Sequence, residues 1–235
     1  ARGVGAQMFL NELRARGANH ECVVAGLAVP CEQRITVSAT RERYLGDHRL
    51  QGKPVVPAMM VLEWFAQAAQ ASCPRMSVQV IEDFRVLKGI SCDSAETSLR
   101  VRLEYDSGSD ARHQRLRATI LSNAQGERVH YTARITLGSE PTASVAHRTG
   151  ENLAAEPFPL PLEIAYRDRL FHGPSLQLIE HIDGLSRAGI VGSLRASSPV
   201  ALGDARVSTW VTDPGLLDAA LQLVVLWGRE KLQAA

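Results

Sequence analysis

One segment limits the possible folds more than any other, because it is a helix that cannot face water. Residues 57–71 begin with proline and continue almost wholly with apolar helix formers. Proline suits the start of a helix, where its missing N–H costs nothing. A helix that is apolar on all sides must be buried nearly all round. A curved sheet is one natural partner that can enclose it.

The residues after this helix supply such a sheet. Apolar and polar residues alternate in three segments, which are 98–105, 113–121 and 127–137. Turn-forming residues separate them, so we expect an antiparallel meander with one apolar face. In the third strand that face is expected to comprise Val129, Tyr131, Ala133 and Ile135.

The second half of the chain repeats this plan. Residues 214–227 predict another proline-opened apolar helix. Each helix has one acid with glutamine four residues later, Glu63 with Gln67 and Asp218 with Gln222. Side chains four residues apart share one helical face. The repeat, at roughly 160 residues, suggests two copies of one unit in which a sheet wraps a helix.

These patterns divide the chain into four parts. We expect an N-terminal extension or linker at 1–33, in which residues 8–13 form a short helix, and a first unit at 34–138. A proline-stiffened linker follows at 139–162. The second unit occupies 163–235, and it is expected to be incomplete because no strands follow its helix.

Composition and charge exclude several classes of function. The 26 basic and 25 acidic residues give a net charge of +1, which provides no electrostatic footprint for nucleic acid or anionic lipid. No apolar run reaches the roughly 20 residues of a membrane span, and no export signal is evident. The four cysteines lack the spacing of a zinc site or a disulfide frame. We therefore expect a cytoplasmic protein with reduced thiols that binds neither nucleic acid nor membrane.

Two polar groups stand out against the apolar background. His48 precedes the first helix, and Asp218 lies within the second. A carboxyl group removed from water holds its proton more tightly, as a general acid must. Histidine titrates near neutrality and can be the complementary base. Such a pair across a dry channel suits β-elimination of water next to a carbonyl group, with Gln222 orienting Asp218.

The backbone after Gly52 completes the predicted site. Its N–H groups, at the start of the first helix, can bind the carbonyl oxygen as it becomes enolate-like. Asp213 is a rival acid, but it precedes Pro214 at the start of the second helix. Aspartate in that position is an ordinary N-cap, so we assign it a structural role.

The pattern His48-xxx-Gly52-xxxx-Pro57, followed by Asp218-xxx-Gln222, resembles the HxxxGxxxxP and DxxxQ motifs of dehydratase domains in type I polyketide synthases. The resemblance extends from about residue 34 to the end of the chain. It implies an α+β double-hotdog fold, with two antiparallel sheets each wrapped round a buried helix. It also implies His48 as base, Asp218 as acid, Gln222 as the orienting group and Gly52 as a contact to the carbonyl.

The same resemblance implies a substrate and partners. The substrate would be a β-hydroxyacyl chain on an acyl carrier protein, converted to an enoyl thioester. No metal or organic cofactor is implied beyond the phosphopantetheine arm of the carrier. Other synthase domains are expected as partners, and a homodimer is left open.

Two segments resemble polyunsaturated-fatty-acid synthases more than ordinary modular enzymes. In the first helix, Pro57, Glu63 and Gln67 have the spacing of single-hotdog fatty-acid dehydratases. The second segment is Phe171-His172-Gly173-Pro174, where most modular dehydratases carry GYxYGPxF and only Gly-Pro is kept. His172 and Gly173 are therefore candidates for substrate contact, although His172 can instead merely shape the turn.

Several alternatives stay open. The same acid and base can catalyse isomerisation of an enoyl chain, or cyclisation as in product-template domains. A third hypothesis is a non-catalytic hotdog domain that binds an acyl chain or stabilises a dimer. Glu63 is expected to be hydrogen-bonded in a closed site, and a second active site with His172 is its alternative.

Overall fold

The computed structural model describes residues 31–93, 95–106, 109, 112–122, 126–139, 156–204 and 206–232. The helix expected over 8–13 and most of the predicted extension, linker and strand-joining turns lie outside these residues. The chain forms two compact units, one of which contains Met60–Ile90 and the other Val145–Ala235. Residues Ala39–Met59 belong to the second unit although in sequence they lie between two segments of the first, Ala1–Ser38 and Met60–Ile90. The predicted domain boundaries therefore stay predictions.

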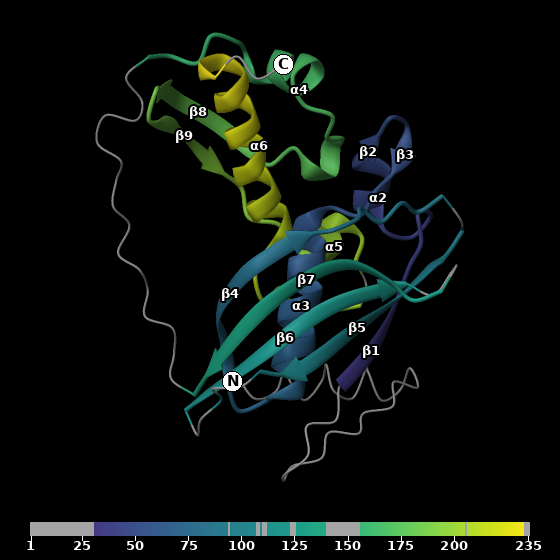
Figure 1. Ribbon diagram of the computed structural model, residues 1–235. Helices are drawn as coiled ribbons and strands as arrows, with labels where there is room; N and C mark the ends of the chain where they lie inside the picture. Colours follow the sequence, from purple (N-terminus) through teal and green to yellow (C-terminus); the bar gives the residue numbers. More distant parts are fainter. Residues whose placement is uncertain are drawn as a thin grey trace. The chain divides into compact units, whose positions relative to one another are not determined.

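The first unit is a five-stranded antiparallel sheet with helix α3 (Ala58–Ser72) against it (Figure 1). The spatial order of the strands is β1-β5-β6-β7-β4. Their bounds are Cys31–Val37 for β1, Ser77–Val86 for β4, Thr97–Tyr105 for β5, His113–Ser122 for β6 and Arg128–Gly138 for β7. The pairing of β5 with β6 and of β6 with β7 confirms the predicted meander. Every residue of α3 is buried or half-buried, as its composition predicts.

The predicted apolar face of β7 is wrong at one position. Tyr131, Ala133 and Ile135 are buried, but Val129 is exposed. The cause is a β-bulge, because Ile120 pairs with Tyr131 while the next residue, Leu121, pairs with Val129. The extra residue, His130, reverses the alternation and is itself buried. Its ring contacts the Ser122 hydroxyl at 2.8 Å.

Strand β4 was not evident from the sequence. Its pairing with β7 shifts register twice, and Asp83 lies in the left-handed region at φ 51°. It is an edge strand, and all of its residues are half-buried or exposed. Because strand prediction depends on a regular alternation, such an irregular edge strand leaves a weak pattern.

The second unit combines short helices, two hairpins and one long helix (Figure 1). A hydrophobic core between α4, β8, β9 and α6 includes Tyr166, Ile179, Ala219 and Leu226. The elements are α2 (Arg43–Asp47), β2 (Arg49–Leu50), β3 (Lys53–Pro54), α4 (Leu162–Asp168), η1 (Pro174–Leu176), β8 (Ile179–Ser186), β9 (Gly189–Leu194), α5 (Pro199–Leu202) and α6 (Pro214–Lys231). In the part of the chain that the structure describes, no helix has the length and apolar character to cross a membrane.

Helix α6 is less enclosed than its composition predicts. Leu221, Val224 and Val225 are 45–54% exposed, so one face of this helix is only partly covered. The two-stranded hairpin β8–β9 packs against α6, and a sheet this narrow covers only one face of a helix. The start of α6 does follow the prediction that Asp213 is an N-cap. The Asp213 carboxylate accepts a hydrogen bond from the Leu216 N–H at 3.0 Å.

Candidate active site

His48 is held by a tight hairpin. It directly follows α2, and β2 and β3 then turn the chain back so that Val55 faces it. The His48 ring N–H donates to the Val55 carbonyl from Nδ1 at 2.8 Å, and Val55 N–H donates to the His48 carbonyl at 3.0 Å. Since a carbonyl can only accept, Nδ1 carries the proton. The lone pair of the neutral ring is therefore on Nε2.

Gly52 closes this hairpin. Gln51 and Gly52 both have positive φ, 52° and 79°, which is the two-residue turn that matches the twist of a hairpin. Gly52 is exposed at this turn, and its carbonyl accepts from Arg49 at 2.8 Å. Its expected contact with the substrate carbonyl stays a prediction. Its position in the turn helps to form the hairpin that holds His48.

A second segment brings His172 beside His48. The two residues form an isolated antiparallel bridge, and their ring centroids are 5.4 Å apart. Asp47 stabilises this contact through two hydrogen bonds. Its carbonyl accepts one from the Gly173 N–H at 2.7 Å, and its carboxylate accepts the other from the Ser175 N–H at 2.8 Å. Sequence reasoning missed Asp47. No local sequence signal marks it, because its role depends on contacts with Gly173 and Ser175 far along the chain.

Asp218 reaches the same place from α6. Gln222, one turn later, donates from Nε2 both to the Asp218 carboxylate at 2.8 Å and to the Leu176 carbonyl at 3.0 Å. Because the Leu176 carbonyl only accepts, the Gln222 amide must present its nitrogen here. Gln222 therefore orients Asp218, as the spacing of the two residues predicts.

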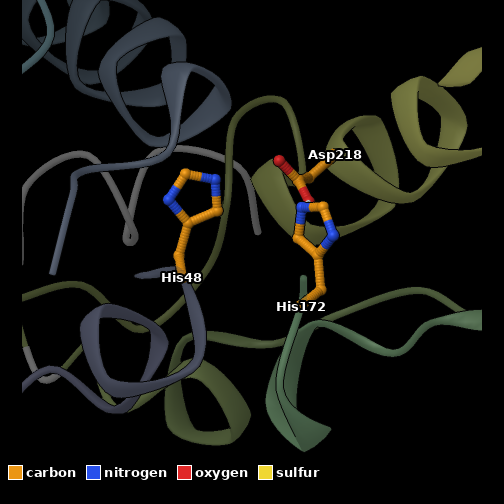
Figure 2. A group of neighbouring side chains, drawn as sticks. All are labelled: His48, His172 and Asp218. Atoms are coloured by element: carbon orange, nitrogen blue, oxygen red, sulfur yellow. The ribbon is translucent and has the colours of Figure 1, made fainter. Parts of the chain in front are cut away.

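His48, His172 and Asp218 form one buried group (Figure 2). One nitrogen or oxygen from each lies within 4.8 Å of the others, and each side chain is less than a tenth exposed. The shortest contact joins His172 Nε2 to Asp218 Oδ2 at 3.3 Å. Residues 170 positions apart in the sequence thus meet in one water-poor place.

Burial sets the charge state of both histidines. It lowers the pKa of His48 below its usual 6.5, although the Val55 carbonyl and Asp218 oppose this shift. It lowers the pKa of His172 further, to about 4, against the attraction of Asp218. Both rings are therefore neutral at pH 7, which leaves His48 able to accept a proton.

A cleft of about 850 Å³ opens beside this group in the second unit. His172 lines it together with four apolar side chains, Leu162, Leu170, Phe171 and Ile179, and with several polar or charged ones, among them Glu163, Gln177 and Glu180. The Phe171 ring stacks on His172, with centroids 4.1 Å apart, and meets the His48 ring edge-on at 5.0 Å. Arg195 provides a positive charge at the cleft wall.

Two other predicted residues are not members of this buried group. Pro57 is buried and directly precedes α3. Glu63 is fully buried on α3, where its carboxylate accepts from Gln67 Nε2 at 2.6 Å. The His172 ring faces Asp218 instead, with its Nε2 atom 3.3 Å from Asp218 Oδ2. These contacts agree with the view that Glu63 is a satisfied buried acid.

Two family models match the chain. One, described as the polyketide synthase dehydratase domain, matches residues 31–123. The other, described as the polyketide synthase dehydratase N-terminal domain, matches residues 147–234. Together they include the segments that carry His48, His172 and Asp218.

Two curated relatives are parts of large synthases. The chain is 27% identical over 203 residues to a polyunsaturated fatty acid synthase protein of Thraustochytrium sp., covering 85% of this chain and 7% of that protein. It is 30% identical over 232 residues to the polyketide synthase ThaG of Burkholderia thailandensis, covering 90% of this chain and 4% of that protein. The chain thus spans a small fraction of either relative's length.

Among solved structures, the dehydratase domain from the CurF module of curacin polyketide synthase shares the fold. The TM-score is 0.68 at 20% sequence identity, and the match covers 88% of this chain and 74% of that one. The antiparallel sheets and buried helix described above are consistent with the double-hotdog architecture of such domains.

Proposed function

Because the chain belongs to the polyketide synthase dehydratase family, we propose that it removes water from a β-hydroxyacyl thioester to give the enoyl thioester. The acyl chain would be carried on the phosphopantetheine arm of an acyl carrier protein within a larger, cytoplasmic synthase. The observation that carries the proposal is the meeting of His48 and Asp218 in one buried group. Unless the two side chains lie close together, they cannot act on one substrate molecule.

His48 is the proposed base. Its neutral Nε2 removes a proton from the carbon next to the thioester carbonyl, while Val55 holds the other ring nitrogen. The electron pair of the broken C–H bond becomes the second bond of the new double bond. Backbone N–H groups at the start of α3, just after Pro57, are the proposed stabilisers of the charge on the carbonyl oxygen.

Asp218 is the proposed acid. As the C–O bond breaks, the protonated carboxyl group transfers its proton to the departing hydroxyl, which leaves as water. Gln222 Nε2 and His172 Nε2 both lie near Oδ2, at 2.8 Å and 3.3 Å. With donors directed at Oδ2, the proton to be transferred belongs on Oδ1.

His172 is proposed to contact the substrate as well. Its Nδ1 atom is buried and has no hydrogen-bond partner within the described part of the chain, and the ring lines the cleft. If Nε2 donates to Asp218, then Nδ1 carries a lone pair and can accept from the substrate hydroxyl. Gly173 holds the backbone of this segment against Asp47.

The test uses the purified chain and 3-hydroxyacyl thioesters on carrier protein or pantetheine. We expect an enoyl thioester, detected by mass spectrometry as loss of one water. His48→Ala and Asp218→Asn should each lower kcat by about 10²- to 10⁴-fold, the usual contribution of a positioned acid or base.

His181→Ala is the matched control, because His181 and Asp183 form a comparable pair at 3.5 Å on the exposed surface of the same unit. This variant should keep full activity. Turnover unchanged by His48→Ala and Asp218→Asn would contradict the assignment. A shifted double bond or a ring product without loss of water would favour isomerisation or cyclisation instead.

A further inference from the structure

The three buried side chains of the candidate site carry atoms of the kinds that can bind a metal ion. They offer two imidazole nitrogens and one carboxylate oxygen within 4.8 Å of one another. Zinc favours these donors, and many zinc sites combine three protein ligands with one open position. We propose that His48, His172 and Asp218 bind a single Zn²⁺ ion, which reversibly inhibits the domain.

His48 is already oriented as a zinc ligand. Histidines that bind zinc commonly donate their other ring N–H to a backbone carbonyl or a carboxylate, which fixes the ring and the tautomer. The Nδ1 bond from His48 to the Val55 carbonyl, at 2.8 Å, provides this support. One nitrogen of His48 faces the other two side chains in Figure 2. The donor needed by the ion is therefore available without rearrangement of the hairpin.

His172 and Asp218 already have the separation of two ligands on one ion. Zn–N and Zn–O bonds near 2.1 Å at a tetrahedral angle place two donor atoms roughly 3.4 Å apart. The observed distance from His172 Nε2 to Asp218 Oδ2 is 3.3 Å. The distances to His48 must shorten, which a small side-chain rotation supplies, and the proton of the neutral His172 ring must reside on Nδ1 so that Nε2 offers its lone pair to the ion. Gln222 supports the carboxylate from behind, as outer-shell partners of zinc ligands do.

The site also has an entrance and room for a further ligand. His172 lines the cleft of about 850 Å³, so an ion can approach from that side and keep a water molecule as its remaining ligand. Once bound, the ion would occupy the lone pair of the base and the carboxylate of the acid. Dehydration would stop because both groups are engaged, whereas removal of the ion by a chelator would restore them.

The test measures binding separately from catalysis, because the inference goes beyond the proposed function. Metal-free chain is titrated with ZnCl₂ by calorimetry, and with CoCl₂ while the visible absorption of low-coordinate Co²⁺ is recorded. We expect one tight site per chain and a melting temperature that rises with zinc. His172→Phe and Asp218→Asn should each weaken binding by at least about tenfold, since loss of even an outer-shell partner costs 10- to 100-fold.

His181→Ala provides the control, because its ring pairs with Asp183 on the surface. It should bind zinc as tightly as the parent chain. If His172→Phe does not fold, as judged by circular dichroism, His48→Gln takes its place. The proposal is overturned if no binding occurs at millimolar zinc, or if these variants bind as tightly as the parent. A chain that binds zinc but lacks dehydratase activity would contradict the proposed function alone.

Discussion

At the scale of single residues, two neutral side chains approach the Asp218 carboxylate on the same side. Gln222 and His172 both approach Oδ2, and Gln222 is itself fixed by the Leu176 carbonyl. The Gln222 hydrogen bond and the His172 contact at Oδ2 leave Oδ1 as the natural position for a proton. The acid is thus held in one orientation by contacts from η1 and α6 together, which a side chain with a single partner would not achieve.

The first prediction concerns the pH dependence of activity. Burial lowers the pKa of His48, and a base must be neutral to accept a proton. The acid limb of kcat/KM should therefore have its midpoint below 6.5, the value of an ordinary histidine. A pH profile between about pH 5 and pH 8 measures it. A midpoint above 6.5 would contradict a buried, neutral His48 as the base.

The second prediction concerns stability. Burial lowers the pKa of His172 to about 4, while the unfolded chain keeps a value near 6.5. Between these values the unfolded state binds more protons than the folded state, so the free energy of unfolding rises with pH. This contribution to the free energy of unfolding is fully present above pH 6.5, and it is lost as the pH falls toward 4.

Urea denaturation at several pH values tests this prediction. His172→Phe should fold with a shallower dependence on pH than the parent chain, because one depressed histidine is removed. His181→Asn, at an exposed position, should leave the slope unchanged. An unchanged slope in His172→Phe would show that His172 is not the group responsible.

At the scale of elements, the contact between the His48 and His172 segments depends on a glycine. A Cβ atom on Gly173 would lie 2.2 Å from Asp47 Oδ1, far inside contact distance. Gly173→Ala should therefore separate the two segments, lower kcat and destabilise the domain by about 1–3 kcal/mol, as overpacking does.

Gly46, in the neighbouring helix α2, is the matched control. A Cβ atom there meets nothing within 4 Å, and alanine favours a helix by up to about 1 kcal/mol over glycine. Gly46→Ala should therefore leave activity unchanged and raise the melting temperature slightly. Equal effects of the two substitutions, measured by thermal denaturation and turnover, would refute the special role of Gly173.

The elements that the sequence predicted are those with a regular local period. The meander and both long helices meet this condition. The Asp213 cap could be predicted for a different reason, because aspartate before a proline at the start of a helix is a local capping pattern. Strand β4 does not, because its register shifts conceal the alternation. The bulge at His130 also has no local signal, since it depends on contacts with Ser122 and Lys88 from other segments.

The candidate site divides in the same way. His48, Asp218 and Gln222 could be predicted because an uncommon polar residue in an apolar segment is visible in the sequence. The spacing also placed Gln222 on the same face of α6 as Asp218. The contributions of Val55 and Asp47 could not be predicted, because each depends on how the chain turns back after His48 and where residues 172–175 lie.

At the scale of the whole molecule, helix α6 presents exposed apolar side chains that are spaced along one helical face. Leu221, Val224 and Val225 lie three and four residues apart and are about half exposed. Contiguous apolar surface promotes association between molecules. We expect the isolated chain to self-associate through this face at high concentration, and Leu221→Lys with Val225→Lys to reduce that association.

Light scattering coupled to gel filtration measures the effect. The double variant should elute at lower average mass than the parent, and each substitution should change the free energy of unfolding by less than about 1 kcal/mol, as for most exposed positions. Leu232→Lys is the control, since Leu232 is 62% exposed but lies at the end of the helix. Leu221→Lys alone adds the same single charge as Leu232→Lys, so an equal fall in mass for these two single variants would indicate general charge repulsion rather than a specific apolar face.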